Sequence, residues 1–217
     1  MMRFANRQEA GRLLAAALMP WTGKKPLVLA LPRGGVPVGY EVARALGGTL
    51  DVLLVRKIGV PGNPEFGVGA VVEGDPPHAV LDDATIQRLH IPRTWLAAEI
   101  ARQEVELERR RQAYAGTRQA PHDDRPIILV DDGIATGGTM RAALSAVADT
   151  PGGVTIAVPV APVEEVAVLS ERFRVVCLEP AEYLGAVGAF YDDFSQTTDE
   201  EVIRLLAKSR GFEESAP

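Results

Sequence analysis

The chain has 217 residues, of which 47% are hydrophobic and 24% charged, and its formal net charge is −6 at pH 7. This size and composition are typical of one globular domain, and the negative charge argues against a basic surface that binds nucleic acid. No stretch is long and apolar enough to span a membrane, and the N-terminus lacks the apolar core of a signal peptide. We therefore expect a cytoplasmic protein with no membrane partner.

Short apolar runs alternate along the chain with segments of helical periodicity. We predict strands at residues 27–31, 50–55, 70–72, 79–81, 127–130, 154–160 and 174–178. Predicted helices occupy residues 4–19, 36–46, 83–90, 93–114, 140–148, 162–169 and 198–208. Because strands and helices alternate with short connections, we expect an α/β fold with a doubly wound, mostly parallel sheet. Ligand-binding loops of such sheets lie at the carboxyl ends of the strands.

The most informative stretch runs from Ile127 to Thr139. It starts with four apolar residues, as expected of a strand buried on both faces, and it leads into the predicted helix 140–148. A Gly- and Thr-rich loop at a helix N-terminus offers N–H groups and hydroxyls to a phosphate. The two carboxylates before that loop, Asp131 and Asp132, instead suit sugar hydroxyls or a hydrated Mg²⁺. The pattern therefore predicts a site for a sugar phosphate.

Val130–Thr139 resembles the signature that binds phosphoribosyl pyrophosphate (PRPP) in the type I phosphoribosyltransferases: apolar residues, two acids, a small stretch, then T-G-G-T. The resemblance implies that Asp131 and Asp132 hold the ribose hydroxyls and, through water, the cofactor Mg²⁺. It implies that the 5′-phosphate lies in the following loop. The loop residues concerned are Ala135, Thr136, Gly137, Gly138 and Thr139.

The same resemblance implies a phosphoribosyltransferase-type fold. We expect a single domain, 1–217, with a core at about 26–178 and a small hood from about 1–20 and 179–217. We also consider a homodimer, with the helix at 4–19 as a candidate subunit interface.

A second strand, loop and helix occupy residues 27–46, with Arg33, Gly34 and Gly35 at the loop. Glycines let the backbone approach an anion closely, and a guanidinium can bind two of its oxygens at once. In the type I phosphoribosyltransferases the equivalent loop binds pyrophosphate, often through a cis peptide. The resemblance implies that role for these three residues, and a Gly-rich turn with a solvated arginine is the alternative.

The predicted strand 50–55 leads into Arg56 and Lys57. Four glycines and two prolines at residues 58–69 argue against a long helix or strand there. This segment resembles the flexible loop of the family, which closes over PRPP and excludes water. Arg56 and Lys57 would then be catalytic residues that neutralise charge on the departing pyrophosphate. The alternative is a solvated hairpin connection between Val55 and the predicted strand 70–72.

Aromatic residues gather near the C-terminus, in the segment expected to belong to the hood. In this family the hood holds the acceptor, and an aromatic ring often stacks on a base. The resemblance therefore suggests Phe190 and Tyr191 as acceptor-binding residues. Packing of these rings between hood and core is the alternative.

The function predicted from these motifs is transfer of the phosphoribosyl group from PRPP to a nitrogenous small-molecule acceptor, such as a nucleobase, with release of pyrophosphate. The protein would contribute positioning and charge stabilisation. Two alternatives use the same fold. One is a regulatory protein that binds PRPP or a nucleotide without catalysis, and the other is a hydrolase or phosphorylase of nucleotides or sugar phosphates.

Overall fold

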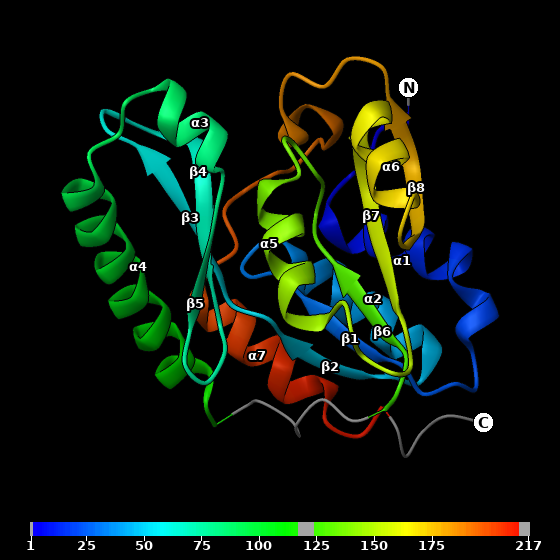
Figure 1. The fold of residues 1–217 in the computed structure, drawn as a ribbon. Coiled ribbons are helices and arrows are strands. Elements are labelled where there is room, and N and C mark those ends of the chain that lie inside the picture. Colours follow the sequence, from blue (N-terminus) through cyan, green and yellow to red (C-terminus); the bar gives the residue numbers. More distant parts are fainter. Residues whose placement is uncertain (1, 117–123, 213–217) are drawn as a thin grey trace. The chain divides into compact units, whose positions relative to one another are not determined.

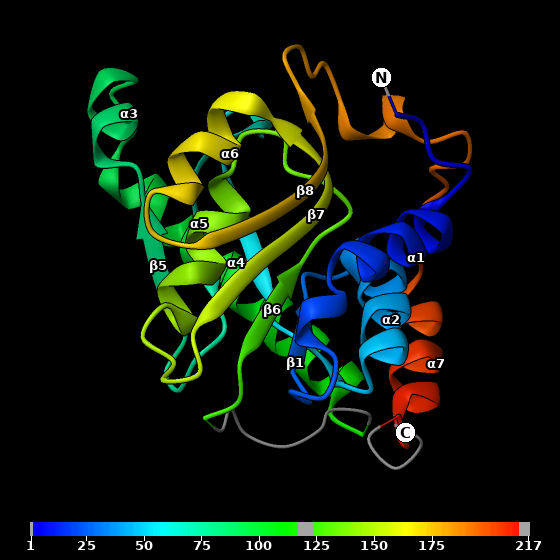
Figure 2. The same ribbon diagram turned by 90° about the vertical axis from the view of Figure 1, so that its right-hand side faces the viewer.

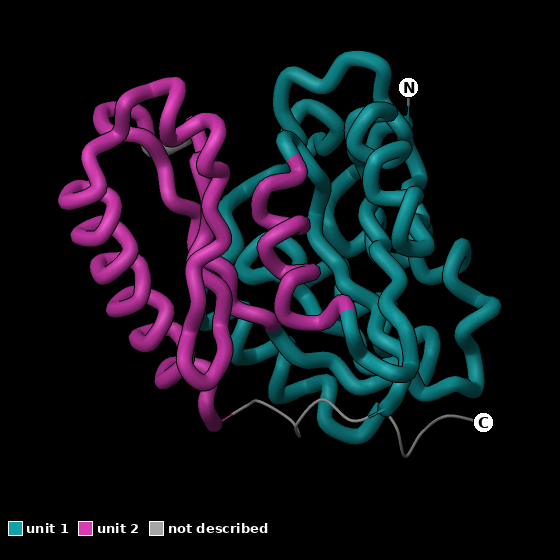
Figure 3. The backbone as a smooth tube through the Cα atoms, viewed as in Figure 1, with its two compact units in different colours: residues 1–52, 117–136, 149–217 teal, residues 53–116, 137–148 magenta. Residues whose placement is uncertain are grey.

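The computed structural model describes residues 2–116 and 124–212, and their contacts divide the chain into two compact units (Figure 3). Unit 1 comprises residues 1–52, 117–136 and 149–217, and unit 2 comprises residues 53–116 and 137–148. Among the described residues, no helix is both long and apolar enough to cross a membrane.

Unit 1 contains a parallel five-stranded sheet in the order β2-β1-β6-β7-β8 (Figure 1). Its strands are β1 (Leu27–Ala30), β2 (Thr49–Val52), β6 (Ile127–Val130), β7 (Val154–Pro162) and β8 (Arg174–Ala181). Every residue of β1, β2 and β6 is buried, and the continuous apolar runs of β1 and β6 predict this for strands covered on both faces. The expected α/β fold with a mostly parallel central sheet is confirmed.

Helices of unit 1 lie on both sides of this sheet (Figure 2). Three of them, α1 (Arg7–Ala17), α2 (Gly35–Leu46) and α7 (Asp199–Ser209), gather on one side, and α6 (Val163–Ser170) lies on the other. Two short 3₁₀ turns, η1 (Met19–Trp21) and η2 (Val187–Phe190), complete the unit. Thr198 is the N-cap of α7, because its side chain accepts a hydrogen bond from the Glu201 amide.

An N-terminal segment and the segment that precedes α7 meet in unit 1. Phe4 pairs with Tyr191 as an isolated β-bridge, and the Phe4 amide donates to the Phe190 carbonyl at 2.8 Å. Phe4, Phe190 and Tyr191 are all buried in one apolar cluster that also includes Val160 of β7. The segments in which we expected a hood therefore pack against each other and against the end of the sheet.

Unit 2 is built on an antiparallel three-stranded sheet in the order β3-β4-β5. Its strands are β3 (Val55–Val60), β4 (Asn63–Val72) and β5 (His78–Leu81), and its helices are α3 (Asp83–Arg88), α4 (Arg93–Tyr114) and α5 (Gly138–Val147). Figure 1 shows the β3–β4 hairpin between α4 and α5. Asp82 caps α3 by accepting from the Thr85 amide at 3.0 Å.

Two expectations for residues 50–69 are wrong. The strand expected at 50–55 ends at Val52, so Arg56 and Lys57 lie inside β3 and not at the carboxyl end of a parallel strand. The segment 58–69 is a β-hairpin, and β4 alone is ten residues long. Its glycines and prolines suit the hairpin: Gly62 has φ +78° at the turn, and register shifts follow Ile58 and Gly59.

Candidate functional site

The order of the strands reverses between β1 and β6. From β1 the sheet extends to β2 on one side and through β6, β7 and β8 on the other. In open parallel sheets, the loops that leave the two central strands at such a point form a crevice for ligands. Here these loops are Leu31–Gly35 after β1 and the acidic tip, Asp131 and Asp132, after β6.

The two loops approach each other so closely that only glycine fits between them. A Cβ atom at Gly34 would lie 2.0 Å from Asp132 Oδ2, and one at Gly35 would lie 2.8 Å from the Val130 carbonyl oxygen. The Leu31 amide also donates to that carbonyl at 2.8 Å. The structure therefore brings the predicted pyrophosphate loop and the predicted ribose carboxylates together.

The turn that carries Arg33 is closed by its own backbone. The Gly35 amide donates to the Leu31 carbonyl at 3.0 Å, and the Val36 amide donates to the Arg33 carbonyl at 3.1 Å. The peptide bond between Pro32 and Arg33 is cis. The Arg33 guanidinium is partly exposed and lies 4.0 Å from an Asp199 carboxylate oxygen at the start of α7.

The acidic pair is held by hydrogen bonds on both residues. Asp131 Oδ1 accepts from the Asp132 amide at 2.8 Å, and the Tyr191 hydroxyl donates to the Asp132 carbonyl at 2.6 Å. Burial raises the pKa of both carboxyl groups, and the charge of Asp132 raises the pKa of Asp131 further. Two carboxylates in a partly buried site therefore favour a ligand that brings hydroxyl donors or positive charge.

Arg7 is a site residue that the sequence analysis missed. Its Nε donates to Asp132 Oδ2 at 2.7 Å, its Nη1 donates to the Ser195 carbonyl at 2.7 Å, and its guanidinium lies 3.9 Å from the centre of the Phe194 ring. The charge of Arg7 opposes the rise in the pKa of Asp132. An arginine in the first turn of an amphipathic helix gives no local signal of this contact, because Asp132 is 125 residues away.

The predicted phosphate loop continues from the acidic pair into α5. Ala135 and Thr136 are exposed, and Gly137 adopts φ +71° at the N-cap of the helix without a side-chain cap. Gly138 and Thr139 form the first turn of α5, where free N–H groups and the helix dipole favour an anion. The chain passes from unit 1 to unit 2 between Thr136 and Gly137, within this loop.

Comparison with known sequences decides the family. A sequence model described as "Phosphoribosyl transferase domain" matches residues 5–176. The chain belongs to the phosphoribosyl transferase family. Two curated proteins from Mycobacterium tuberculosis strains CDC 1551 and H37Rv, each bearing the name "Putative phosphoribosyl transferase", are 42% identical to it over 99% of this chain. The chain spans about half the length of these curated relatives, 49% of each.

The chain is also similar to solved structures. The crystal structure of TT1426 from Thermus thermophilus is 48% identical, covers 95% of this chain and 99% of that chain, and superposes with a TM-score of 0.79. Orotate phosphoribosyltransferase from M. tuberculosis, solved in complex with PRPP, is 17% identical with a TM-score of 0.44, covering 81% of this chain and 74% of that one.

The residues expected to assist the leaving group lie in unit 2 of this phosphoribosyl transferase. Arg56 is half-buried against α4, where its Nε donates to Gln103 Oε1 at 3.1 Å. Burial and the charge of Arg110 lower the pKa of Arg56, while Glu106 raises it. Lys57 precedes Ile58 on the same strand, and its aliphatic stem fills the space beside Gly67. The structure thus places Arg56 in a side-chain network on α4.

The aromatic residues expected to bind the acceptor are buried. Phe190 is 2% exposed and Tyr191 is 3% exposed, so neither ring offers a face to a ligand in this structure. Tyr191 packs against Phe4 at 5.4 Å and against Phe194 at 5.0 Å between ring centres. In this structure the two rings have a packing role, with the Tyr191 hydroxyl bound to Asp132, and stacking of either ring on an acceptor stays a prediction.

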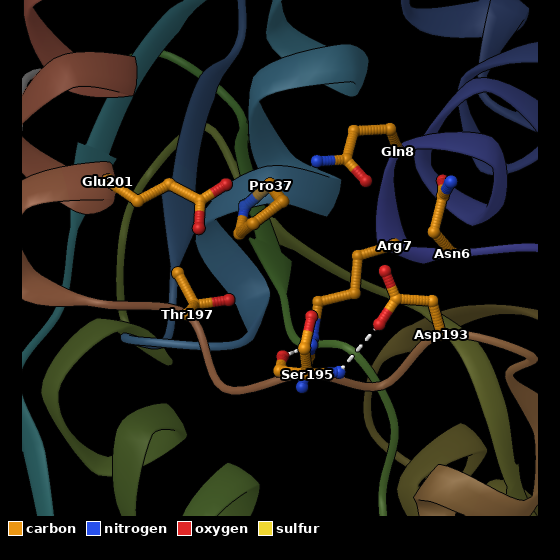
Figure 4. Close-up of a pocket in the computed structure, with 8 residues that line it drawn as sticks. All are labelled: Asn6, Arg7, Gln8, Pro37, Asp193, Ser195, Thr197 and Glu201. Atoms are coloured by element: carbon orange, nitrogen blue, oxygen red, sulfur yellow. Dashed lines mark hydrogen bonds between the residues drawn. The ribbon is translucent and has the colours of Figure 1, made fainter.

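A polar pocket adjoins the acidic pair in unit 1 (Figure 4). It is lined by residues at the start of α1, in the first turn of α2, in the C-terminal segment that leads into α7 and in the first turn of α7. These residues are Asn6, Arg7, Gln8, Pro37, Asp193, Ser195, Thr197 and Glu201. The pocket is connected to the acidic pair through Arg7, which both lines it and binds Asp132.

Proposed function

We propose that this chain transfers the phosphoribosyl group from PRPP to a nitrogenous acceptor and releases pyrophosphate. The observation that carries this proposal is the close approach of the Gly34–Gly35 loop to Asp131 and Asp132 at the reversal point of the sheet. That geometry suits a ligand with a diol next to a diphosphate. Membership of the phosphoribosyl transferase family supports the same substrate.

Each part of PRPP has a proposed partner in the chain. Asp131 and Asp132 accept hydrogen bonds from the ribose hydroxyls, and the loop from Ala135 to Thr139 binds the 5′-phosphate at the start of α5. Arg33 binds the pyrophosphate and stabilises the charge that grows on it as the bond to the sugar breaks. Arg33 must then exchange its 4.0 Å contact with Asp199 for the diphosphate.

The acidic pair also suits a magnesium ion shared with the substrate. Among the described residues, no group of three or more His, Cys, Asp or Glu side chains could hold a metal by itself. Mg²⁺ commonly takes only one or two carboxylates and completes its shell with water and phosphate oxygens. The raised pKa values of Asp131 and Asp132 indicate a site that gains from added positive charge. When bound, Mg²⁺ would supply charge to the diphosphate.

Consumption of PRPP with a panel of nitrogenous acceptors tests this proposal. We expect pyrophosphate release that depends on an acceptor, on Mg²⁺ and on Arg33. The variant Arg33→Ala should lower turnover more than the affinity for PRPP, because its contact strengthens as the bond breaks. Tight PRPP binding without turnover of any acceptor would support the regulatory alternative. Consumption of PRPP without an acceptor would support a hydrolase.

A further inference from the structure

The polar pocket beside Arg7 has the composition of a binding site. Its cavity volume is about 60 Å³, and it is open to solvent on one side. Three side chains enter it from different elements: Gln8 from α1, Thr197 from the C-terminal segment and Glu201 from α7. In Figure 4 the Gln8 amide, the Thr197 hydroxyl and the Glu201 carboxylate point toward the same space beside Pro37.

Thr197 is the most informative of these residues. It is 4% exposed, and within the described part of the chain its hydroxyl makes no hydrogen bond. Buried polar groups are nearly always satisfied, so a buried hydroxyl that points into a cavity indicates a partner from outside the protein. A hydroxyl can both donate and accept a hydrogen bond.

The neighbouring groups define what that partner offers. Glu201 supplies acceptor oxygens, and its contact with Arg204 is a long ion pair of 3.8 Å. Arg7 also lines the pocket, and it uses Nε and Nη1 for Asp132 and Ser195, while its Nη2 makes no hydrogen bond within the described part of the chain. Gln8 offers both a carbonyl and an NH₂ group. The pocket therefore presents hydrogen-bond donors and acceptors side by side.

Charge argues against an anion in this pocket. Asp193 and Glu201 both line it, and Arg7 is already paired with Asp132. The lining also contains no aromatic ring among the described residues, so a ligand that binds only by stacking finds no partner. A neutral ligand with an N–H group beside a C=O group matches the lining, since the N–H can donate to Glu201 and the C=O can accept from Thr197 or Arg7.

We propose that this pocket holds the acceptor and that the acceptor presents a lactam or amide edge, N–H beside C=O. The inference rests on the proposed transferase function. It adds the acceptor class and assigns specificity to Thr197, Glu201 and Gln8. Arg7 connects the acceptor site with the PRPP site, because it lines this pocket and its guanidinium also binds Asp132, a carboxylate assigned to the ribose.

The test compares matched pairs of probes that differ in the lactam edge. Binding of hypoxanthine and uracil, and of purine and pyrimidine as their ring systems without carbonyl groups, is measured by calorimetry on the full chain with Mg²⁺ and pyrophosphate. The variants are Thr197→Val, which keeps the shape but removes the hydroxyl, and Glu201→Gln. Glu200→Gln is the control, because it makes the same charge change in the same turn of α7 at a residue outside the pocket.

We expect at least one lactam probe to bind about tenfold or more tightly than its carbonyl-free partner, because a site built for hydrogen bonds rejects ligands that lack them. Thr197→Val and Glu201→Gln should each weaken that probe by about three- to tenfold, with Glu200→Gln unchanged. Affinity for PRPP, measured in parallel, should stay the same in all three variants. If Thr197→Val does not fold, Glu201→Gln on the partly exposed face of α7 decides the result.

Two results would overturn the inference while leaving the transferase proposal intact. One is normal PRPP binding with no preference for either lactam probe. The other is equal probe affinity in Thr197→Val, Glu201→Gln and the original chain, which would mean that a water molecule satisfies the threonine. Failure of PRPP itself to bind would instead overturn the proposed function.

Discussion

Two charged pairs follow or lie within strands of this chain, and they are held in different ways. Asp131 and Asp132 leave the end of a parallel strand, remain partly exposed and have raised pKa values. Arg56 and Lys57 lie inside an antiparallel strand, and Arg56 is engaged with Gln103 of α4. The end of a parallel strand directs side chains toward a ligand. In a hairpin strand, alternate side chains instead point to one face of the sheet, where they pack against the helix that covers it.

The largest expected effect separates these two pairs. Changing Asp131 and Asp132 together to Asn should weaken PRPP binding by about 100-fold or more, because hydrogen bonds to charged groups contribute about 1.5–3 kcal/mol each and two carboxylates are lost. Arg56→Gln should leave PRPP affinity nearly unchanged, because its guanidinium faces α4. Calorimetric titration with PRPP measures both, and Asp149→Asn, at an exposed site, is the control. Equal losses in the acidic and Arg56 variants would break the comparison.

The next effect concerns the counter-charge of the acidic pair. Arg7→Met keeps the aliphatic stem but leaves Asp132 without its cation, which should cost about 1.5–3 kcal/mol in unfolding free energy. In a double-mutant cycle with Asp132→Asn, most of that loss should disappear. Denaturant unfolding gives the coupling energy.

Arg3→Met provides the control for this cycle, because Arg3 pairs with Asp192 at side chains that are 62% and 63% exposed. We expect about 0–1 kcal/mol there. A coupling energy near zero for Arg7 and Asp132 would show that the pair does not act as a unit.

The difference between the two regions also explains which features the sequence could predict. The segments 27–46 and 127–147 each consist of an apolar strand, a tight loop and a helix in direct succession. Their order and chemistry are therefore visible in consecutive residues. The sequence does not reveal site residues that depend on contacts between distant parts of the chain. Arg7 reaches Asp132 across 125 residues, and no periodicity along α1 reports this.

The hairpin was misread for a different reason. Glycine and proline usually interrupt strands, and residues 58–69 contain six of them. In β3 and β4 they instead form the turn at Gly62 and the places where the strands shift register or approach closely. At Gly69 a Cβ atom would lie 2.4 Å from the Val80 carbonyl oxygen, so the glycine there permits the pairing with β5.

A smaller effect on stability is expected at Tyr191, whose hydroxyl binds the backbone of the acidic pair. Tyr191→Phe removes the hydroxyl that donates to the Asp132 carbonyl and should cost about 1 kcal/mol. The melting temperature should fall by about 2–4 °C, and the KM for an acceptor should not change. Tyr183→Phe, at a residue that is 88% exposed, is the control and should change neither quantity. A rise in acceptor KM with unchanged stability would restore the stacking role.

The smallest effect on stability is expected in unit 2, where Glu106 interacts with the arginines around Arg56. Hydrogen bonds from Arg109 and Arg110 lower the pKa of Glu106 to about 2. Glu106 also raises the pKa of Arg56. Because the pKa of Glu106 is lower in the folded state than in the unfolded chain, its stabilisation is present above about pH 4.5 and is lost as the pH falls toward 2.

Glu106→Gln should therefore lower the melting temperature at pH 7 by about 1–3 °C, the shift expected for a partly exposed ion pair contributing about 0.3–1 kcal/mol. The difference from the original chain should shrink between about pH 4.5 and pH 3 and should also shrink in 1 M salt, where the Debye length is about 3 Å. Thermal melts across this pH series measure it. A difference that stays constant with pH and salt would mean that Glu106 acts through packing, and Arg56 would then be held by Gln103 alone.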